Sequence, residues 1–232
     1  MGEEISQRWI LRPLLPRWLT ERGIVALVGA DQFIYYQQFD PHQRFAPDIY
    51  VLPGVPPETR VRAWKTWETG IVPSFALEIA SDEWEKDYVE APRRCAAARI
   101  GELVVFDPSW GERPGGVGVR WQLFRQPERG GLRRIEATNE PAIRSRVLGC
   151  WLRVVGAGSA TRIRIGVGPR GASLVATSEE AERAARQAER AAKQAQEAER
   201  AAKERALARV SELEAKLAGL TSGGKARGSG GR

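Results

Sequence analysis

The segment between residues 74 and 108 constrains the fold of this chain more than any other part. It contains two apolar runs, SFALEIAS and ELVVFDP, of the kind that form buried strands at the centre of a sheet. The residues between these runs have a helical pattern, at least from Ala91 to Ala98. A strand, a helix and a second strand predict two parallel neighbours joined by a right-handed crossover.

Further elements are predicted on both sides of this unit. Residues 5–22 carry apolar side chains at helical spacing, but Pro13 and Pro16 are expected to kink or split that helix. The remaining elements are short β-type runs bounded by glycine, proline or polar turns. They are IVALVGA (24–30), FIYYQQF (33–39), DIYVLPG (48–54), RWQLFRQ, LRRIEA, RVLGCWLRVV and TRIRIGVG.

The composition changes abruptly at Thr177, where TSEE has the sequence of a capping box with Glu180 as its acidic member. Neither glycine nor proline then occurs until Gly219, and alanines repeat at heptad-like spacing before leucines take over near the end. We therefore expect a globular domain at 1–176, a charged Ala-rich helix at 177–220 and a disordered basic tail at 221–232. The leucine end favours a coiled coil and a homo-oligomer; a solvent-exposed single helix is the alternative.

Several classes of protein are excluded by the composition. No stretch approaches the roughly 20 apolar residues of a membrane span, and the charged, proline-broken start is not a secretory signal. Cys95 and Cys150 are far apart beside apolar residues, which predicts buried free thiols and a cytoplasmic location. His42 is the single histidine, so a His-based zinc site or a Ser-His-Asp triad is not expected.

The positive charge is unevenly distributed along the chain. Residues 1–108 hold 12 Lys/Arg against 16 Asp/Glu, whereas residues 109–176 hold 12 against 4. A basic surface beside an acidic one suits a phosphate-backbone substrate such as DNA, and an arginine-rich solvated face is the plain alternative. The eight tryptophans, Trp151 among them, can stack on bases, but packing in the core is the favoured interpretation.

Two acidic residues stand at unusual positions in the predicted strands. Asp48 follows Pro47 at the start of one strand, and Glu78 lies inside the apolar run FALEIAS. A carboxylate within an apolar strand is costly unless it is paired or binds a metal. Two carboxylates at neighbouring strand ends can hold Mg²⁺ or Mn²⁺, which activates water and neutralises phosphate charge. A turn role at strand entry is the alternative for Asp48.

Five blocks occur in order along the chain: APDIYVLPGVP, WKTWE, PSFALEIASDEWEKDY, GELVVFDP and RSRVLGCWLRV. In their order and spacing they resemble the Uma2 family of restriction endonucleases, in the PD-(D/E)XK nuclease superfamily, over roughly residues 20–180. The resemblance implies an α/β fold with a restriction-endonuclease-like mixed central sheet, flanking helices and a long C-terminal helix. It also implies metal-dependent hydrolysis of DNA phosphodiester bonds.

The resemblance assigns roles to individual residues. It implies that Asp48 and Glu78 are the catalytic acids that bind Mg²⁺ or Mn²⁺, with the peptide carbonyl of Ile79 or Ala80 as a further metal ligand. The lysine of the family motif is replaced by Ala80, and Ala91 stands where relatives carry a basic residue in the helix.

Other charged residues near these acids have weaker assignments. Lys86 is the candidate to replace the motif's lysine near the attacking water or scissile phosphate; Lys65 is a second choice, and a solvated role for Lys86 is the alternative. Asp87 is expected to cap the helix that follows it, and Asp107 to be structural. The family's first acidic element is not found at the start, so the reading frame is expected to be truncated there.

Three hypotheses for the function follow. The first is a magnesium-dependent endonuclease that cuts DNA. The second is a catalytically degenerate nuclease fold that only binds nucleic acid or a partner, which Ala80, Ala91 and the short N-terminus favour. The third is an oligomerising adaptor that acts through its terminal helix.

Overall fold

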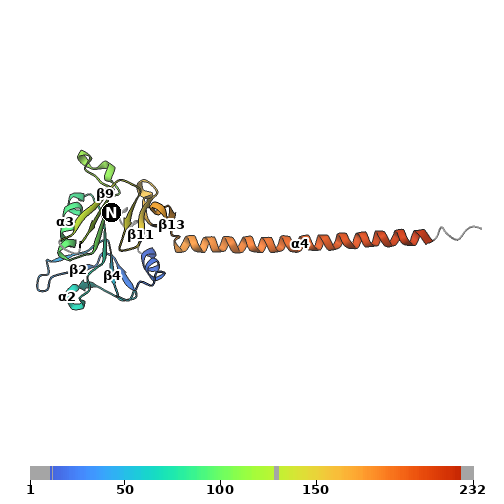
Figure 1. The fold of residues 1–232 in the computed structure, drawn as a ribbon, viewed down its shortest axis with the longest axis horizontal. Coiled ribbons are helices and arrows are strands. Elements are labelled where there is room, and N and C mark those ends of the chain that lie inside the picture. Colours follow the sequence, from blue (N-terminus) through green and yellow to red (C-terminus); the bar gives the residue numbers. More distant parts are fainter. Residues whose placement is uncertain (1–10, 12, 128–130, 226–232) are drawn as a thin grey trace, which may run out of the picture. The chain divides into compact units, whose positions relative to one another are not determined.

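The fold was analysed in a computed structural model that describes residue 11 and residues 13–127 and 131–225. The chain divides into two compact units, one ending at Val175 and the other beginning at Ala176. The first unit is a mixed α/β domain and the second is a long helix (Figure 1). None of the helices in the described part is both long and apolar enough to cross a membrane.

A mixed six-stranded sheet forms the centre of the α/β unit. Its parallel pair is β6 and β7, joined by α3 (Trp84–Ala97), which confirms the predicted parallel neighbours. The other neighbouring pairs of this sheet are antiparallel. Across the sheet the order is β1 (Ala26–Gly29), β4 (Ile49–Pro53), β6 (Phe75–Ile79), β7 (Glu102–Phe106), β8 (Trp121–Arg125) and β9 (Arg133–Thr138).

Two smaller sheets flank the central one. The first has the order β3 (Arg44–Phe45), β2 (Phe33–Tyr35), β5 (Ala63–Lys65), and β5 leads into α2 (Thr66–Thr69). The second is antiparallel, with β10 (Ala142–Ser145), β11 (Cys150–Val155), β12 (Arg162–Val167) and β13 (Ser173–Leu174). Short 3₁₀ turns connect several of these strands: η1 (Trp110–Glu112), η2 (Pro114–Gly116), η3 (Gly158–Ala160) and η4 (Pro169–Gly171).

Two predicted strands are shorter than their patterns, and the one predicted at 33–39 already ends at Tyr35. The run RVLGCWLRVV begins as the turn between β10 and β11, and its strand starts only at Cys150. Gly149 adopts a φ of +66° in that turn and donates a hydrogen bond to the carbonyl of Arg146. A positive φ is costly for other residues, so the glycine marks a reversal of the chain within the apolar run.

The core consists of two apolar layers, one on each face of the central sheet. One layer contains Cys95 and Ala98 of α3, packed with Ala76 and Leu103 of β6 and β7. The other layer is filled by the N-terminal helical segment, helical at residues 13–20, together with the inner face of the β10–β13 sheet.

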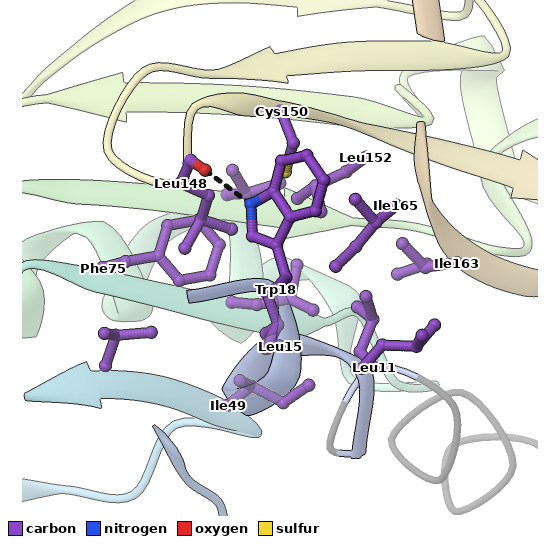
Figure 2. Close-up of a cluster of buried hydrophobic side chains, with 14 of the residues drawn as sticks. Leu11, Leu15, Trp18, Ile49, Phe75, Leu148, Cys150, Leu152, Ile163 and Ile165 are labelled. Carbon is purple, nitrogen blue, oxygen red and sulfur yellow. Dashed lines mark hydrogen bonds between the residues drawn. The ribbon is translucent and has the colours of Figure 1, made fainter. Parts of the chain in front are cut away.

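Trp18 lies at the centre of the second layer (Figure 2). Its indole N–H donates a hydrogen bond of 2.8 Å to the carbonyl of Leu148, and its ring is 3% exposed. Leu15 lies beside it, with Phe75 from the central sheet and Leu152 from the smaller sheet around it. The N-terminal segment therefore joins the two sheets through apolar contact.

Two acidic side chains are fully buried in structural contacts. Glu102 accepts hydrogen bonds from the Nε of Arg125 at 2.7 Å and from the hydroxyl of Ser145, which links the central sheet to β10. Asp107 pairs with Arg113 at 2.8 Å and accepts a hydrogen bond from the Tyr88 hydroxyl. These partners compensate the buried charges and agree with the structural role predicted for Asp107.

The second unit is the helix α4 (Ser178–Lys225). Its start is the predicted capping box, because the Glu180 N–H donates to the Thr177 hydroxyl and the Thr177 N–H donates to the Glu180 carboxylate. The prediction that residues 221–232 form a disordered tail was wrong for 221–225, which are helical. Each glycine costs a helix only about 1 kcal/mol, and no proline interrupts the chain there. Residues 226–232 lie outside the described part of the chain.

Candidate active site

The two predicted metal ligands meet where β4 and β6 lie side by side. These strands are antiparallel, with Ile49 opposite Leu77. Continuing this register by one residue places Asp48 opposite Glu78. Side chains alternate between the faces of a strand, and Ile49, Leu77 and Ile79 belong to the layer that contains Trp18. Asp48 and Glu78 therefore point to the other face of the sheet, the one that α3 covers.

A hydrogen bond joins Asp48 to β6, the strand that carries Glu78. The N–H of Ile79 donates a hydrogen bond of 2.6 Å to Oδ2 of Asp48, which is only 9% exposed. The Glu78 carboxyl lies close enough to Asp48 for the two carboxyl groups to interact directly. The sequence placed these acids 30 residues apart, and the strand register brings their carboxyl groups into contact.

The electrostatic environment favours the protonated form of Glu78. Burial is the largest cause that raises the pKa of Glu78 well above the usual range of a glutamate, followed by the negative charges of Asp48 and Asp87. Two neighbouring carboxylates in a buried site repel each other, so one of them holds a proton. A divalent cation at the same place would relieve that repulsion.

Glu78 lines a cavity of about 380 Å³. The α3 helix contributes Lys86 and Ala91 to its wall, while β3 contributes Arg44. Lys86 thus shares a cavity with Glu78, as its predicted role requires. Its ammonium group is about half exposed and lies 3.7 Å from the Glu83 carboxylate. The other lining residues are Phe33, His42, Phe45, Ala46, Asp87, Glu90 and Arg94.

Arg44 is a candidate functional residue that the sequence did not indicate. Its guanidinium lies over the ring of Phe33 at 4.3 Å and donates a hydrogen bond of 2.9 Å to the Tyr35 hydroxyl. These contacts hold the cation in place without neutralising it. Arg94, in the same cavity, is paired with Glu90 at 2.7 Å. No motif spacing connects Arg44 to Glu78, and the two residues meet only as lining residues of this cavity in the folded chain.

Two other predictions about charged residues have different outcomes. Asp87 was predicted to cap the helix after it, and this was wrong, because Asp87 lies within the first turn of α3. Its carboxylate instead accepts hydrogen bonds from the N–H and hydroxyl of Ser81, at 2.8 and 2.9 Å. Lys65, the second choice for the catalytic lysine, pairs with Glu68 at 2.8 Å and does not line the cavity.

The cysteines are buried free thiols, as predicted. Burial raises the pKa of the Cys150 thiol to about 12 and also raises the pKa of Cys95. Both side chains therefore stay protonated at neutral pH, whereas a metal-binding cysteine is a thiolate.

The donor set around Asp48 and Glu78 fits a hard divalent cation. It offers two carboxylates, which are oxygen ligands, beside the backbone of Ile79. Magnesium and manganese accept few protein oxygens and complete their shells with water. No group of three or more His, Cys, Asp or Glu side chains that could hold a metal occurs among the residues described. A cation here would therefore depend on backbone and water oxygens as well as the two acids.

Comparisons with known proteins agree with the resemblance seen in the sequence. The family model described as "Uma2: Putative restriction endonuclease" matches residues 5–155. No protein of curated function matches the chain. Among solved structures, one from Anabaena variabilis is described as a "putative nuclease belonging to DUF820". It is 12% identical, with a TM-score of 0.43, and the match covers 64% of this chain and 75% of that one.

Proposed function

The chain belongs to the Uma2 family, and from that premise we propose that it is a metal-dependent endonuclease that hydrolyses DNA phosphodiester bonds. The observation that carries this proposal is the contact between the carboxyl groups of Asp48 and Glu78 at the edge of a cavity. Two carboxyl groups this close in a largely buried site repel each other, and a divalent cation between them would relieve that repulsion.

In this proposal Asp48, Glu78 and the carbonyl of Ile79 hold Mg²⁺ or Mn²⁺. When bound, such an ion acidifies a coordinated water and neutralises charge on the phosphoryl oxygens. The N–H of Ile79 fixes one oxygen of Asp48 and so orients its carboxylate. Burial by α3 keeps the site in a low dielectric, where each charge interaction is stronger than in water.

The cations of the cavity position the substrate. Arg44 is already held by Phe33 and Tyr35, so its guanidinium can bind a phosphate at little entropic cost. Lys86 is half exposed and only loosely paired with Glu83, which leaves its ammonium able to turn toward the attacking water or the scissile phosphate. Together they take the place of the motif's lysine, where this chain has Ala80.

Incubation of supercoiled plasmid with the full-length protein tests this function. We expect nicked and linear DNA with Mn²⁺ or Mg²⁺, and intact plasmid when EDTA is present. Binding of DNA without nicking under any divalent cation would contradict catalysis and support the degenerate nuclease fold instead.

Metal affinity should increase with pH, because the ion must displace the proton of Glu78. The pKa of Glu78 is raised in the folded protein, so its protonated form stabilises the metal-free fold, and this contribution is lost as pH rises through that pKa. Below the raised value, the affinity for Mn²⁺ should rise about tenfold per pH unit, with about one proton released per ion. Isothermal titration in two buffers of different ionisation enthalpy measures both quantities.

A matched variant serves as the control for this titration. Glu85→Gln removes an exposed carboxylate from the neighbouring helix α3 and should leave both the affinity and the proton release unchanged. Glu78→Gln should remove the binding. Metal affinity that is independent of pH would show that the ion binds elsewhere.

We also propose that the chain self-associates through the leucine end of α4. Leu207, Val210, Leu213 and Leu217 are between 49% and 70% exposed at near-heptad spacing. Substituting Leu207→Glu and Leu213→Glu in the full-length protein should reduce the mass measured by light scattering to that of a monomer. A wild-type protein that is already monomeric at high concentration would contradict this proposal.

A further inference from the structure

The β10–β13 sheet has two faces of opposite character. Its inner face packs Ile143, Leu152, Ile163 and Ile165 into the core beside Trp18. The alternate residues of the same strands point away from the core. On this outer face the strand register places Arg153 between Ala142 and Arg164, and Trp151 between Arg144 and Gly166.

This outer face is cationic, with no acidic residue in its own strands. From residue 141 to residue 176 the sequence contains six arginines and no aspartate or glutamate. Arg153 lies directly opposite Arg164 across β11 and β12, and Arg162 lies two residues further along the same face. Arg164 is only 8% exposed and donates a hydrogen bond to the carbonyl of Val175, so an anion over this face would meet Arg144, Arg153 and Arg170.

Arg144 and Arg153 are held by contacts that leave their charge in place. Arg153 donates a hydrogen bond of 3.2 Å to the carbonyl of Arg170, and Arg144 lies 5.8 Å from the centre of the Trp151 ring. Within the described residues, Arg144, Arg153 and Arg170 make no ion pair with a carboxylate. A cavity of about 390 Å³ adjoins them, lined by Trp151, Arg153 and Arg170 among others.

We propose that the outer face of the β10–β13 sheet binds the phosphate backbone of duplex DNA. Arg144, Arg153 and Arg170 contact successive phosphates, and Trp151 provides a rigid apolar floor between them. Phosphate contacts of this kind position a protein on DNA without reading its sequence. This inference rests on the proposed function, which makes DNA the substrate, and adds a surface outside the candidate active site.

Two carboxylates mark one boundary of this surface. Glu136 and Glu140, from β9 and the loop after it, line the same cavity as Arg153 and Arg170. Their carboxylates would repel phosphate, so the DNA backbone is not expected to pass over these two residues. Removing their charge should therefore strengthen DNA binding, whereas removing an arginine should weaken it. A purely structural role of these residues would not produce opposite signs.

The test is a salt titration of DNA binding by the full-length protein in EDTA, which prevents cleavage. Fluorescence anisotropy of a labelled duplex gives the affinity at each NaCl concentration. The logarithm of the affinity falls with the logarithm of salt by about 0.9 for each phosphate neutralised. The double variant Arg144→Gln, Arg153→Gln should reduce this slope by nearly 2, and Glu136→Gln with Glu140→Gln should tighten binding.

A matched control and a folding check accompany the titration. Arg60→Gln with Arg62→Gln removes two exposed arginines elsewhere and should preserve the slope. Thermal unfolding of each variant shows whether it is folded. An unchanged slope in the folded Arg144/Arg153 variant would overturn the proposal. The proposal would also be overturned if the wild-type protein bound polyglutamate but not DNA and the Arg144/Arg153 variant lost that binding. The occupant of the surface would then be an acidic protein.

The outcomes also separate this surface from the proposed activity. If DNA binding depends on these arginines but the protein never cleaves DNA, only the nuclease proposal is contradicted. If the protein cleaves DNA but its salt slope does not depend on Arg144 and Arg153, only the proposed DNA-binding surface is contradicted.

Discussion

Glu78→Gln is expected to lower the rate of DNA cleavage by at least about a thousandfold. The substitution removes one of two carboxylates that contact each other in the proposed metal site. Metal-assisted charge stabilisation contributes several kcal/mol to such reactions, and each 1.36 kcal/mol is worth about a factor of ten in rate. Plasmid nicking under single-turnover conditions with Mn²⁺ measures the change. Asp48→Asn should show a loss of similar size.

The free energy of unfolding of these variants shows whether a loss of cleavage comes from the missing carboxylate or from an unfolded protein. Glutamine has nearly the shape of glutamic acid and carries no charge, so Glu78→Gln should leave the metal-free fold intact or more stable at neutral pH. Asparagine at position 48 keeps an oxygen that can accept the hydrogen bond from Ile79. Cleavage by a folded Glu78→Gln variant at the wild-type rate would remove this residue from the active site.

Trp18→Ala is expected to lower the free energy of unfolding by about 3–5 kcal/mol. The ring is 3% exposed within the apolar layer shown in Figure 2, and its removal leaves a cavity between the two sheets. It also deprives the buried carbonyl of Leu148 of its hydrogen-bond donor. Urea denaturation of the full-length protein, followed by circular dichroism, gives the difference.

The controls for this prediction vary the burial of the aromatic side chain. Trp18→Phe keeps most of the apolar volume but loses the indole N–H, so its effect should be smaller than that of alanine. Phe39→Ala removes a ring that is 94% exposed and should leave the stability nearly unchanged. Equal effects for Trp18→Ala and Phe39→Ala would show that the N-terminal segment does not join the two sheets.

Much of the candidate site could be predicted from local sequence. Glu78 is detectable because a charged residue interrupts an otherwise apolar strand, and Asp48 because it follows proline at a strand start. Their contact depends on the antiparallel pairing of β4 with β6, which no local pattern specifies. Arg44 could not be found, because it meets Glu78 only as a lining residue of the cavity in the folded chain.

The incorrect predictions have different origins. Asp87 has the residue type of a helix cap, yet it lies within the first turn of α3, where its carboxylate accepts hydrogen bonds from Ser81. The apolar run RVLGCWLRVV has a continuous β pattern, but Gly149 reverses the chain within it. The first outcome involves a contact with the loop before the helix, whereas the second follows from the local conformation of a glycine, which outweighs the β preference of its neighbours.

By itself, the sequence determined the types of the main elements, the parallel β6–β7 pair and the start of α4 at Thr177. These features follow from side-chain periodicity and capping, which act over a few residues along the chain. Only the tertiary structure decided which strands are neighbours, which cations surround Glu78, and that the arginines of β10–β12 share one face. Those outcomes depend on burying apolar surface between distant segments, a non-directional force that local sequence patterns do not encode.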